Sequence, residues 1–214
     1  MAGLAALVVV TLVILAAFWR YARSPAEVER SDRLRRVAAR LGLDFTDEGE
    51  PVFLSAMHPF TILQAGQVPR FRNLMYGILE KVEVAAFDLH YEAGGKQRAL
   101  TICSFHVTGM LLPRFELRCK STPDDLLPYF GYRDLISRHL PEFSPEYILG
   151  GEPEEAVRAL FPSRALDRLR ALWGFCLEGQ GDILLFYRPG LTAAPEEIEP
   201  MLRDALQALV PFIE

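Results

Sequence analysis

Histidine is the side chain best suited to bind a metal or to move a proton near neutral pH, and it occurs at positions 58, 90, 106 and 139. No HExxH spacing and no CxxC pair is present, so neither common zinc motif occurs. We expect Tyr91 to pair with Gln97 across a hairpin turn. In that register His90 and His106 lie at opposite ends of one hairpin and cannot share a metal ion. The sequence therefore predicts no metal site.

Asp88 and His90 are two residues apart in a predicted strand, so their side chains share one face. A carboxylate beside an imidazole can work as a general acid–base pair. The same spacing is more often a solvated or hydrogen-bonded pair at the protein surface. We favour the surface pair.

Other catalytic and nucleotide-binding motifs are incomplete. Gly94-Gly95-Lys96 resembles the end of a phosphate-binding loop, but the first glycine, the following Ser or Thr and the helix are all missing. There is no Gly-x-Ser-x-Gly motif, and Ser104 and Ser121 have no local context that would activate them. We therefore predict no catalytic residue, no cofactor site and no enzymatic activity.

Three cysteines, Cys103, Cys119 and Cys176, are odd in number and far apart in the sequence. This pattern is typical of reduced thiols and not of a disulfide framework. Cys103 and Cys119 are expected on neighbouring strands but offset along them. Buried, unreactive thiols are the favoured interpretation.

The segment Ala2–Trp19 contains no charged residue. As a helix it would span roughly 27 Å, close to the thickness of a hydrocarbon core. Trp19 and Tyr21 would lie at the membrane interface, followed by Arg20 and Arg23. A cleaved signal peptide needs a basic start and a small-residue cleavage site, which are absent, and a buried core helix fits poorly at this position. We expect residues 2–19 to cross a lipid bilayer.

Charge predicts the orientation of that span. Residues 20–40 contain seven Arg against three acidic residues, and no basic side chain precedes residue 20. The positive-inside rule then places the remainder of the chain in the bacterial cytoplasm, attached to the inner membrane by a single pass. Residues 41–214 are acidic overall, which argues against nucleic acid as a partner.

The length indicates one water-soluble domain after the anchor. We divide the chain into residues 1–23, an anchor with a basic flank, and residues 24–214, a single α+β domain. Ser24-Pro25-Ala26-Glu27 has the pattern of a capping box, which predicts a helix that Gly42 ends. A short helix or turn is expected at 52–57.

Strand patterns follow in the middle of the chain, rich in β-branched and aromatic residues. The predicted strands, joined by turns as an antiparallel meander, are Phe71–Leu79, Val82–Tyr91, Arg98–Val107 and Leu111–Cys119. Helical patterns return at 152–160 and 163–172. A second hairpin is predicted from 173–178 and 182–188, and a final helix from 195–209. The expected fold is thus a meander sheet, a second hairpin and flanking helices.

Tyr129, Phe130, Tyr132 and Arg133 form an aromatic, basic cluster outside any predicted element. Loops carry binding residues more often than strands do, and aromatic and Arg side chains are enriched in protein interfaces. We predict a surface for a protein partner here. The alternative that remains open is that these rings cover the end of the core.

Five segments carry a resemblance to an uncharacterised group of membrane-anchored bacterial proteins. They are Arg72–Gly77, Val82–Asp88, Leu112–Leu117, Phe143–Tyr147 and Glu178–Asp182. The resemblance implies a membrane-anchored bacterial protein of unknown function, and it carries over no site residue.

Two functions remain open from the sequence. The first is a non-enzymatic interaction or scaffold module on the cytoplasmic face of a bacterial membrane, which the anchor and the missing catalytic groups favour. The alternative is a binding protein for a lipid or another apolar ligand. It rests on the 23 aromatic residues and on a curved sheet that could enclose a pocket.

Overall fold

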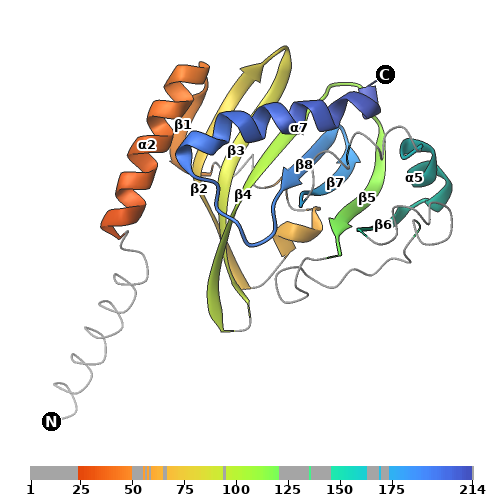
Figure 1. Ribbon diagram of the computed structural model, residues 1–214, viewed down its shortest axis with the longest axis horizontal. Coiled ribbons are helices and arrows are strands. Elements are labelled where there is room, and N and C mark those ends of the chain that lie inside the picture. Colours follow the sequence, from red (N-terminus) through yellow and green to blue (C-terminus); the bar gives the residue numbers. More distant parts are fainter. Residues whose placement is uncertain are drawn as a thin grey trace, which may run out of the picture.

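An antiparallel sheet of eight strands is the framework of the computed structural model, with helices α2 (Pro25–Leu41) and α7 (Ile198–Ile213) against one of its faces (Figure 1). The described residues are 24–49, 55, 57, 59–64, 67–93, 95–120, 135, 146–162, 169 and 174–213. This arrangement confirms the predicted α+β class.

The strands are β1 (Asp44–Glu48), β2 (Gln67–Leu79), β3 (Val82–Ala93), β4 (Lys96–His106), β5 (Leu112–Cys119), β6 (Tyr147–Glu152), β7 (Cys176–Gly181) and β8 (Ile183–Tyr187). The shorter helices are η1 (Thr61–Gln64), α5 (Glu154–Leu160) and η3 (Pro195–Glu197). The predicted helix at 163–172 lies almost entirely outside the described residues.

Helix α2 begins and ends as its sequence predicts. The backbone N–H of Glu27 donates to Ser24 Oγ at 3.2 Å, and the N–H of Ser24 donates to Glu27 Oε2 at 2.7 Å, which completes the capping box. Gly42 adopts φ 71°, the left-handed conformation that ends a helix at low cost for glycine. Leu34 and Val37 are buried on the face that meets the sheet.

The sheet order corrects the predicted four-strand meander. The order is β1-β2-β3-β4-β8-β7-β5-β6, so the β7–β8 hairpin lies between β4 and β5. Strand β8 is buried on both faces from Leu184 to Tyr187. This burial is typical of a strand inside the sheet, where other parts of the protein pack against both faces. For the same reason Cys103 and Cys119 are not on neighbouring strands, although both thiols are buried as predicted.

The hairpin register also differs from the prediction, by one residue. Ala93 pairs with Lys96 across a two-residue turn, so Tyr91 lies opposite Arg98 and not opposite Gln97. A one-residue slip changes every cross-strand partner. His106 therefore lies opposite Glu83, although His90 and His106 remain at opposite ends of the hairpin.

Each face of the sheet has its own hydrophobic cluster. The face that contains Val84 and Ala86 packs against α2, α5 and α7, and we call it the helix face. The opposite face contains Ala85 and Phe87 and packs against η1 through Ile62, and we call it the η1 face. β3 is thus buried on both sides, as its sequence predicts.

Within the described part of the chain, no helix is long and apolar enough to cross a membrane. The predicted span at 2–19 lies outside that part, so the transmembrane segment has no support from the structure. The boundary at residues 23 and 24 stays a prediction for the same reason.

Candidate functional site

A hollow of about 540 Å³ lies on the η1 face, over strands β2, β3, β4 and β8. We call it the β2–β3 hollow. Its apolar side chains include Met57, Leu74, Tyr76, Ile78, Ala85 and Ile183, and its polar side chains are Glu83, Ser104, His106 and Asp182. The volume lies within the range of pockets that hold small molecules.

Two large apolar side chains at this hollow are left in contact with solvent. Ile78 is 68% exposed and Tyr76 is 36% exposed, although both lie in the long strand β2. An Ile side chain that is removed from water contributes roughly 1.5–3 kcal/mol. A ligand with an apolar portion would therefore gain free energy by covering Ile78.

His106 forms a charged cluster at the polar side of the hollow. Its Nδ1 lies 2.6 Å from Glu83 Oε2, and its Nε2 lies 2.8 Å from Asp182 Oδ2. The hydrogen bonds from Glu83 and Asp182 raise the pKa of His106. When the ring is protonated it donates to both carboxylates and the cluster carries one net negative charge, and when the ring is neutral the cluster carries two.

This geometry does not favour His106 as a catalytic base. Both ring nitrogens are engaged by carboxylates, and a general base needs a free nitrogen within reach of the proton that it removes. The same carboxylates can accept hydrogen bonds from hydroxyl or ammonium groups of a ligand. The cluster is therefore better suited to recognise a polar group than to perform a reaction.

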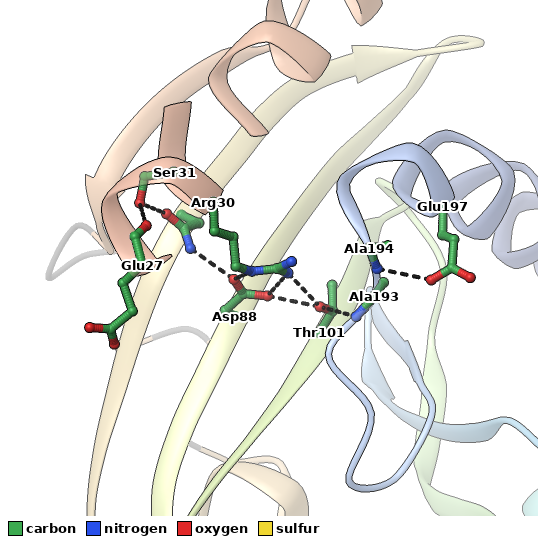
Figure 2. A network of polar contacts seen from close by, with 9 residues as sticks. Glu27, Arg30, Ser31, Asp88, Thr101, Ala193, Ala194 and Glu197 are labelled. Carbon is green, nitrogen blue, oxygen red and sulfur yellow. Dashed lines mark hydrogen bonds and ion pairs between the residues drawn. The ribbon is translucent and has the colours of Figure 1, made fainter. Parts of the chain in front are cut away.

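A second polar centre lies on the helix face, around Asp88, which is 1% exposed. Arg30 Nε donates to Asp88 Oδ2 and Arg30 Nη2 to Asp88 Oδ1, each at 2.9 Å (Figure 2). Asn73 Nδ2 donates to Oδ2 at 2.8 Å, and Thr101 Oγ1 donates to Oδ1 at 2.8 Å. Four donated hydrogen bonds, two of them from a guanidinium, compensate the buried charge.

The Asp88 centre joins elements that are distant in the sequence. Ser31 Oγ donates to Asn73 Oδ1 at 2.6 Å, which ties α2 to β2. Thr101 Oγ1 accepts from the N–H of Ala193 at 2.9 Å, which ties β4 to the segment before η3 (Figure 2). These contacts fix helix α2 on the sheet, and we interpret the centre as structural.

A β-bulge places Asn73 at this centre. The register of β2 shifts between Arg72 and Met75, so two residues of β2 lie opposite one residue of β3. Asn73 has φ 55°, a left-handed conformation that Asn tolerates better than most residues. Bulges of this kind redirect a side chain, and here the amide points to Asp88.

The Asp88–His90 pair is not the surface pair that the sequence suggested. Asp88 is hydrogen-bonded as expected but buried, and both of its oxygens are used by other residues. Burial lowers the pKa of His90, although the nearby charge of Asp88 opposes that effect. The structure brings no acid–base pair together at these two positions.

A third polar centre consists of two buried glutamates on the η1 face. Glu116 of β5 lies opposite Glu178 of β7, and each is 2% exposed. Burial raises the pKa of both side chains, and the charge of Glu178 raises that of Glu116 further. Two ionised carboxylates on directly opposite residues repel each other, and in a buried site this repulsion is strongly unfavourable.

The two glutamates differ in their partners. Glu178 accepts from the N–H groups of Thr61 and Ile62, at 2.6 Å and 3.0 Å, and from the Tyr187 hydroxyl at 2.7 Å. Both carboxyl oxygens of Glu116 are buried without a hydrogen-bond partner. Three donors stabilise the ionised form of Glu178, whereas nothing comparable stabilises the ionised form of Glu116.

Buried thiols complete the survey of reactive side chains. Cys103, Cys119 and Cys176 are all buried thiols, and burial raises the pKa of the Cys103 thiol. A buried neutral thiol is a poor nucleophile. Among the described residues, no group of His, Cys, Asp and Glu side chains has the arrangement of a metal site.

The predicted partner surface is Tyr129, Phe130, Tyr132 and Arg133. It lies outside the described residues, so it stays a prediction. The hollow, by contrast, was not expected at its observed place.

Sequence reasoning missed the His106 cluster and the paired glutamates for different reasons. The one-residue error in register placed His106 opposite the wrong neighbour. The Glu116–Glu178 pair depends on the β5–β7 contact, which no local pattern reveals. The available signal was a carboxylate between apolar neighbours, as in Phe115-Glu116-Leu117, but strand alternation reads that pattern as a solvated face.

No protein-family model matches the chain, and no curated protein matches its sequence. The crystal structure of the mycobacterial trehalose monomycolate transport factor A, TtfA, is similar to the chain, with a TM-score of 0.60 and 16% sequence identity. The similarity covers 85% of this chain and 95% of that one. At this identity the two proteins share a fold, and the likeness extends no further.

Proposed function

We propose that the chain is a non-enzymatic binding protein for an amphiphilic, lipid-like molecule, and that the β2–β3 hollow is its binding site. The exposure of Ile78 inside a hollow of about 540 Å³ carries the proposal. An exposed apolar side chain in a concave, mainly apolar lining is typical of a site that a ligand covers.

The charged cluster at the hollow favours one class of polar head. With His106 between Glu83 and Asp182, the cluster has a net negative charge whether or not the ring is protonated. Carboxylate oxygens accept hydrogen bonds from hydroxyl groups and attract cations, whereas they repel phosphate and sulfate. We propose that the ligand has an uncharged, hydroxyl-bearing or a cationic head, with its apolar chain against Tyr76 and Ile78.

The similarity to TtfA supports a lipid as the ligand class. TtfA is a trehalose monomycolate transport factor. This chain shares its fold, and the hollow offers a place for a molecule with an apolar chain. The support comes from the combination, since the fold alone does not define a ligand.

The hollow also bears on the scaffold hypothesis. A scaffold module needs no internal apolar site, whereas this sheet leaves Ile78 uncovered among the described residues. We therefore prefer ligand binding to a purely scaffolding role. A location at the cytoplasmic face of a bacterial membrane remains our proposal from the Ala2–Trp19 segment. A reporter that works only in the cytoplasm, fused after Glu214, should be active.

The binding proposal can be tested by photolabelling of the full chain. A photoactivatable alkyl glycoside would be cross-linked to the protein, and the labelled peptides mapped by mass spectrometry. We expect labels in peptides of β2, β3 and β8 that line the hollow. This mapping separates specific binding from labelling of the apolar N-terminal segment.

Two variants make the test specific. Ile78→Glu places a charge in the apolar lining and should reduce labelling about tenfold, because a charge that loses water costs well over 1 kcal/mol. Leu111→Glu is the matched control, since Leu111 is 90% exposed and is not part of the lining. Equal labelling of both variants and the natural chain would rule out the hollow as the site.

A further inference from the structure

We propose that Glu116 and Glu178 share one proton, and that this proton keeps residues 59–64 attached to the sheet. The proposal concerns a proton-binding site on the η1 face and does not depend on the proposed ligand. It rests on the contacts of Glu178 with η1, on the position of Glu116 opposite it, and on the lack of space between them.

The attachment is made by Glu178. Its carboxylate accepts from the N–H groups of Thr61 and Ile62. The first N–H groups of a helix have no acceptor within the helix itself. These hydrogen bonds join Thr61 and Ile62 to a strand more than a hundred residues later in the sequence. The Ile62 side chain is fully buried, so apolar packing holds η1 on the sheet together with these hydrogen bonds.

Glu116 controls whether this attachment is stable. It lies opposite Glu178 in the register of β5 and β7, and its two carboxyl oxygens have no hydrogen-bond partner. When Glu116 is protonated, Glu178 can carry the single negative charge that its three donors stabilise. When Glu116 also ionises, the pair carries two like charges, and their repulsion opposes the position of Glu178 under η1.

There is little room for water to relieve that repulsion in place. The space bordered by Glu116, Glu178, Gln180 and Thr61 measures about 10 Å³, at the lower limit for a single water molecule. Loss of the proton to solvent is therefore coupled to local opening. The segment that opens is η1 with Pro59 and Phe60, which border the same space.

Other charged and titratable groups lie around the pair. Arg114 and Arg118 of β5 lower the pKa of Glu116, but burial and Glu178 outweigh them. On β8, Tyr187 donates to Glu178, and its own pKa is raised well above the usual value, so it stays protonated. Cys176 of β7 is buried, and η1 donates to Glu178 through the backbone N–H groups of Thr61 and Ile62.

Amide hydrogen exchange of the full chain tests the proposal directly. The protection of the Thr61 and Ile62 amides would be measured between pH 6 and 9, corrected for intrinsic exchange and compared with amides of β3. We expect protection to fall at least tenfold as the second carboxyl ionises. The isosteric Glu116→Gln variant should show less than a twofold fall, because its side chain cannot ionise.

Two further variants complete the design. Glu178→Gln should leave both amides weakly protected at every pH, since the charged acceptor is gone. Glu48→Gln removes an exposed carboxylate and should behave as the natural chain does. The proposal is overturned if the Glu116→Gln variant and the natural chain share one pH dependence. It is also overturned if magnesium chloride restores protection at pH 9, because the occupant would then be a cation.

Discussion

Two buried acidic centres lie on opposite faces of the sheet, and their buried carboxylates are compensated in different ways. On the helix face, Asp88 is paired with Arg30 and accepts from Asn73 and Thr101 (Figure 2). On the η1 face, Glu116 and Glu178 are paired with each other. A buried carboxylate with a cation is an attachment that operates at any ordinary pH, whereas a buried pair of carboxylates requires a proton.

The comparison shows why burial alone does not reveal the role of an acidic residue. Asp88 and Glu178 both accept several hydrogen bonds from distant elements, and both hold a helix against the sheet. Only the second centre has an uncompensated carboxyl beside it. The charge of the nearest neighbour therefore decides whether such a centre responds to pH.

The largest effect is expected from Asp88→Ala. Removal of one partner of a buried ion pair leaves Arg30 and the other donors uncompensated, which costs about 3 kcal/mol of unfolding free energy. Urea unfolding of the full chain would measure it. Glu196→Ala is the matched control. Glu196 forms an exposed ion pair, at 2.9 Å, with Arg33, which lies in α2 as Arg30 does. Loss of this exposed pair should cost less than about 1 kcal/mol. Similar costs for both variants would contradict the structural role of Asp88.

Glu116→Gln should have the next largest effect, and its sign depends on pH. The folded pKa values of Glu116 and Glu178 are raised to about 8 and about 7, so the folded state binds more protons than the unfolded state above pH 4.5. The stability of the natural chain therefore falls as pH rises toward 8. The variant should be more stable than the natural chain at pH 9, by roughly 2 kcal/mol. Parallel stability profiles for the two proteins would argue against a shared proton.

A smaller effect is expected from Ser31→Ala, which removes the link between α2 and Asn73. The lost hydrogen bond should cost about 1 kcal/mol. Because Asn73 also donates to Asp88, the costs of Ser31→Ala and Asp88→Ala should not add. A double-mutant cycle should give a coupling above roughly 0.5 kcal/mol, and additive costs would show that Ser31 is independent of the Asp88 centre.

The smallest effect concerns the exposed His106 cluster. Glu83 and Asp182 raise the pKa of His106, so their contribution to stability is present below the ordinary histidine pKa and is lost as pH rises through the folded value. Solvent screens these side chains, and the change in stability should be minor. NMR titration should show the pKa of His106 falling in a Glu83→Gln, Asp182→Asn double variant. An unchanged titration would mean that neither carboxylate contacts the ring in solution.

Much of the local structure follows from the sequence. The capping box at Ser24, the stop at Gly42 and the turn at Glu80 and Lys81 each depend on a few consecutive residues. Both turn residues adopt the positive φ that a two-residue hairpin requires. Runs of β-branched and aromatic residues between turn residues likewise located most of the strands, but β1 and β6 were not predicted.

The candidate sites were less accessible to sequence reasoning. The hollow depends on which side chains of four strands meet over one face, and β8 lies beside β4, where the predicted meander placed Leu111–Cys119. The bulge at Asn73 redirects a side chain without a glycine or proline to mark it. The His106 cluster required a register exact to one residue, which turn patterns define only loosely.

The sequence by itself determined the α+β class, the ends of α2, and most strands of the sheet. Only the tertiary structure decided that Asp88 meets a cation while Glu116 meets another acid. The first contact joins Arg30 and Asp88, which are 58 positions apart, and the second follows from the pairing of β5 with β7, which places Glu116 opposite Glu178. Local propensities act within a few residues, whereas the fate of a buried charge depends on whatever side chain the completed fold places beside it.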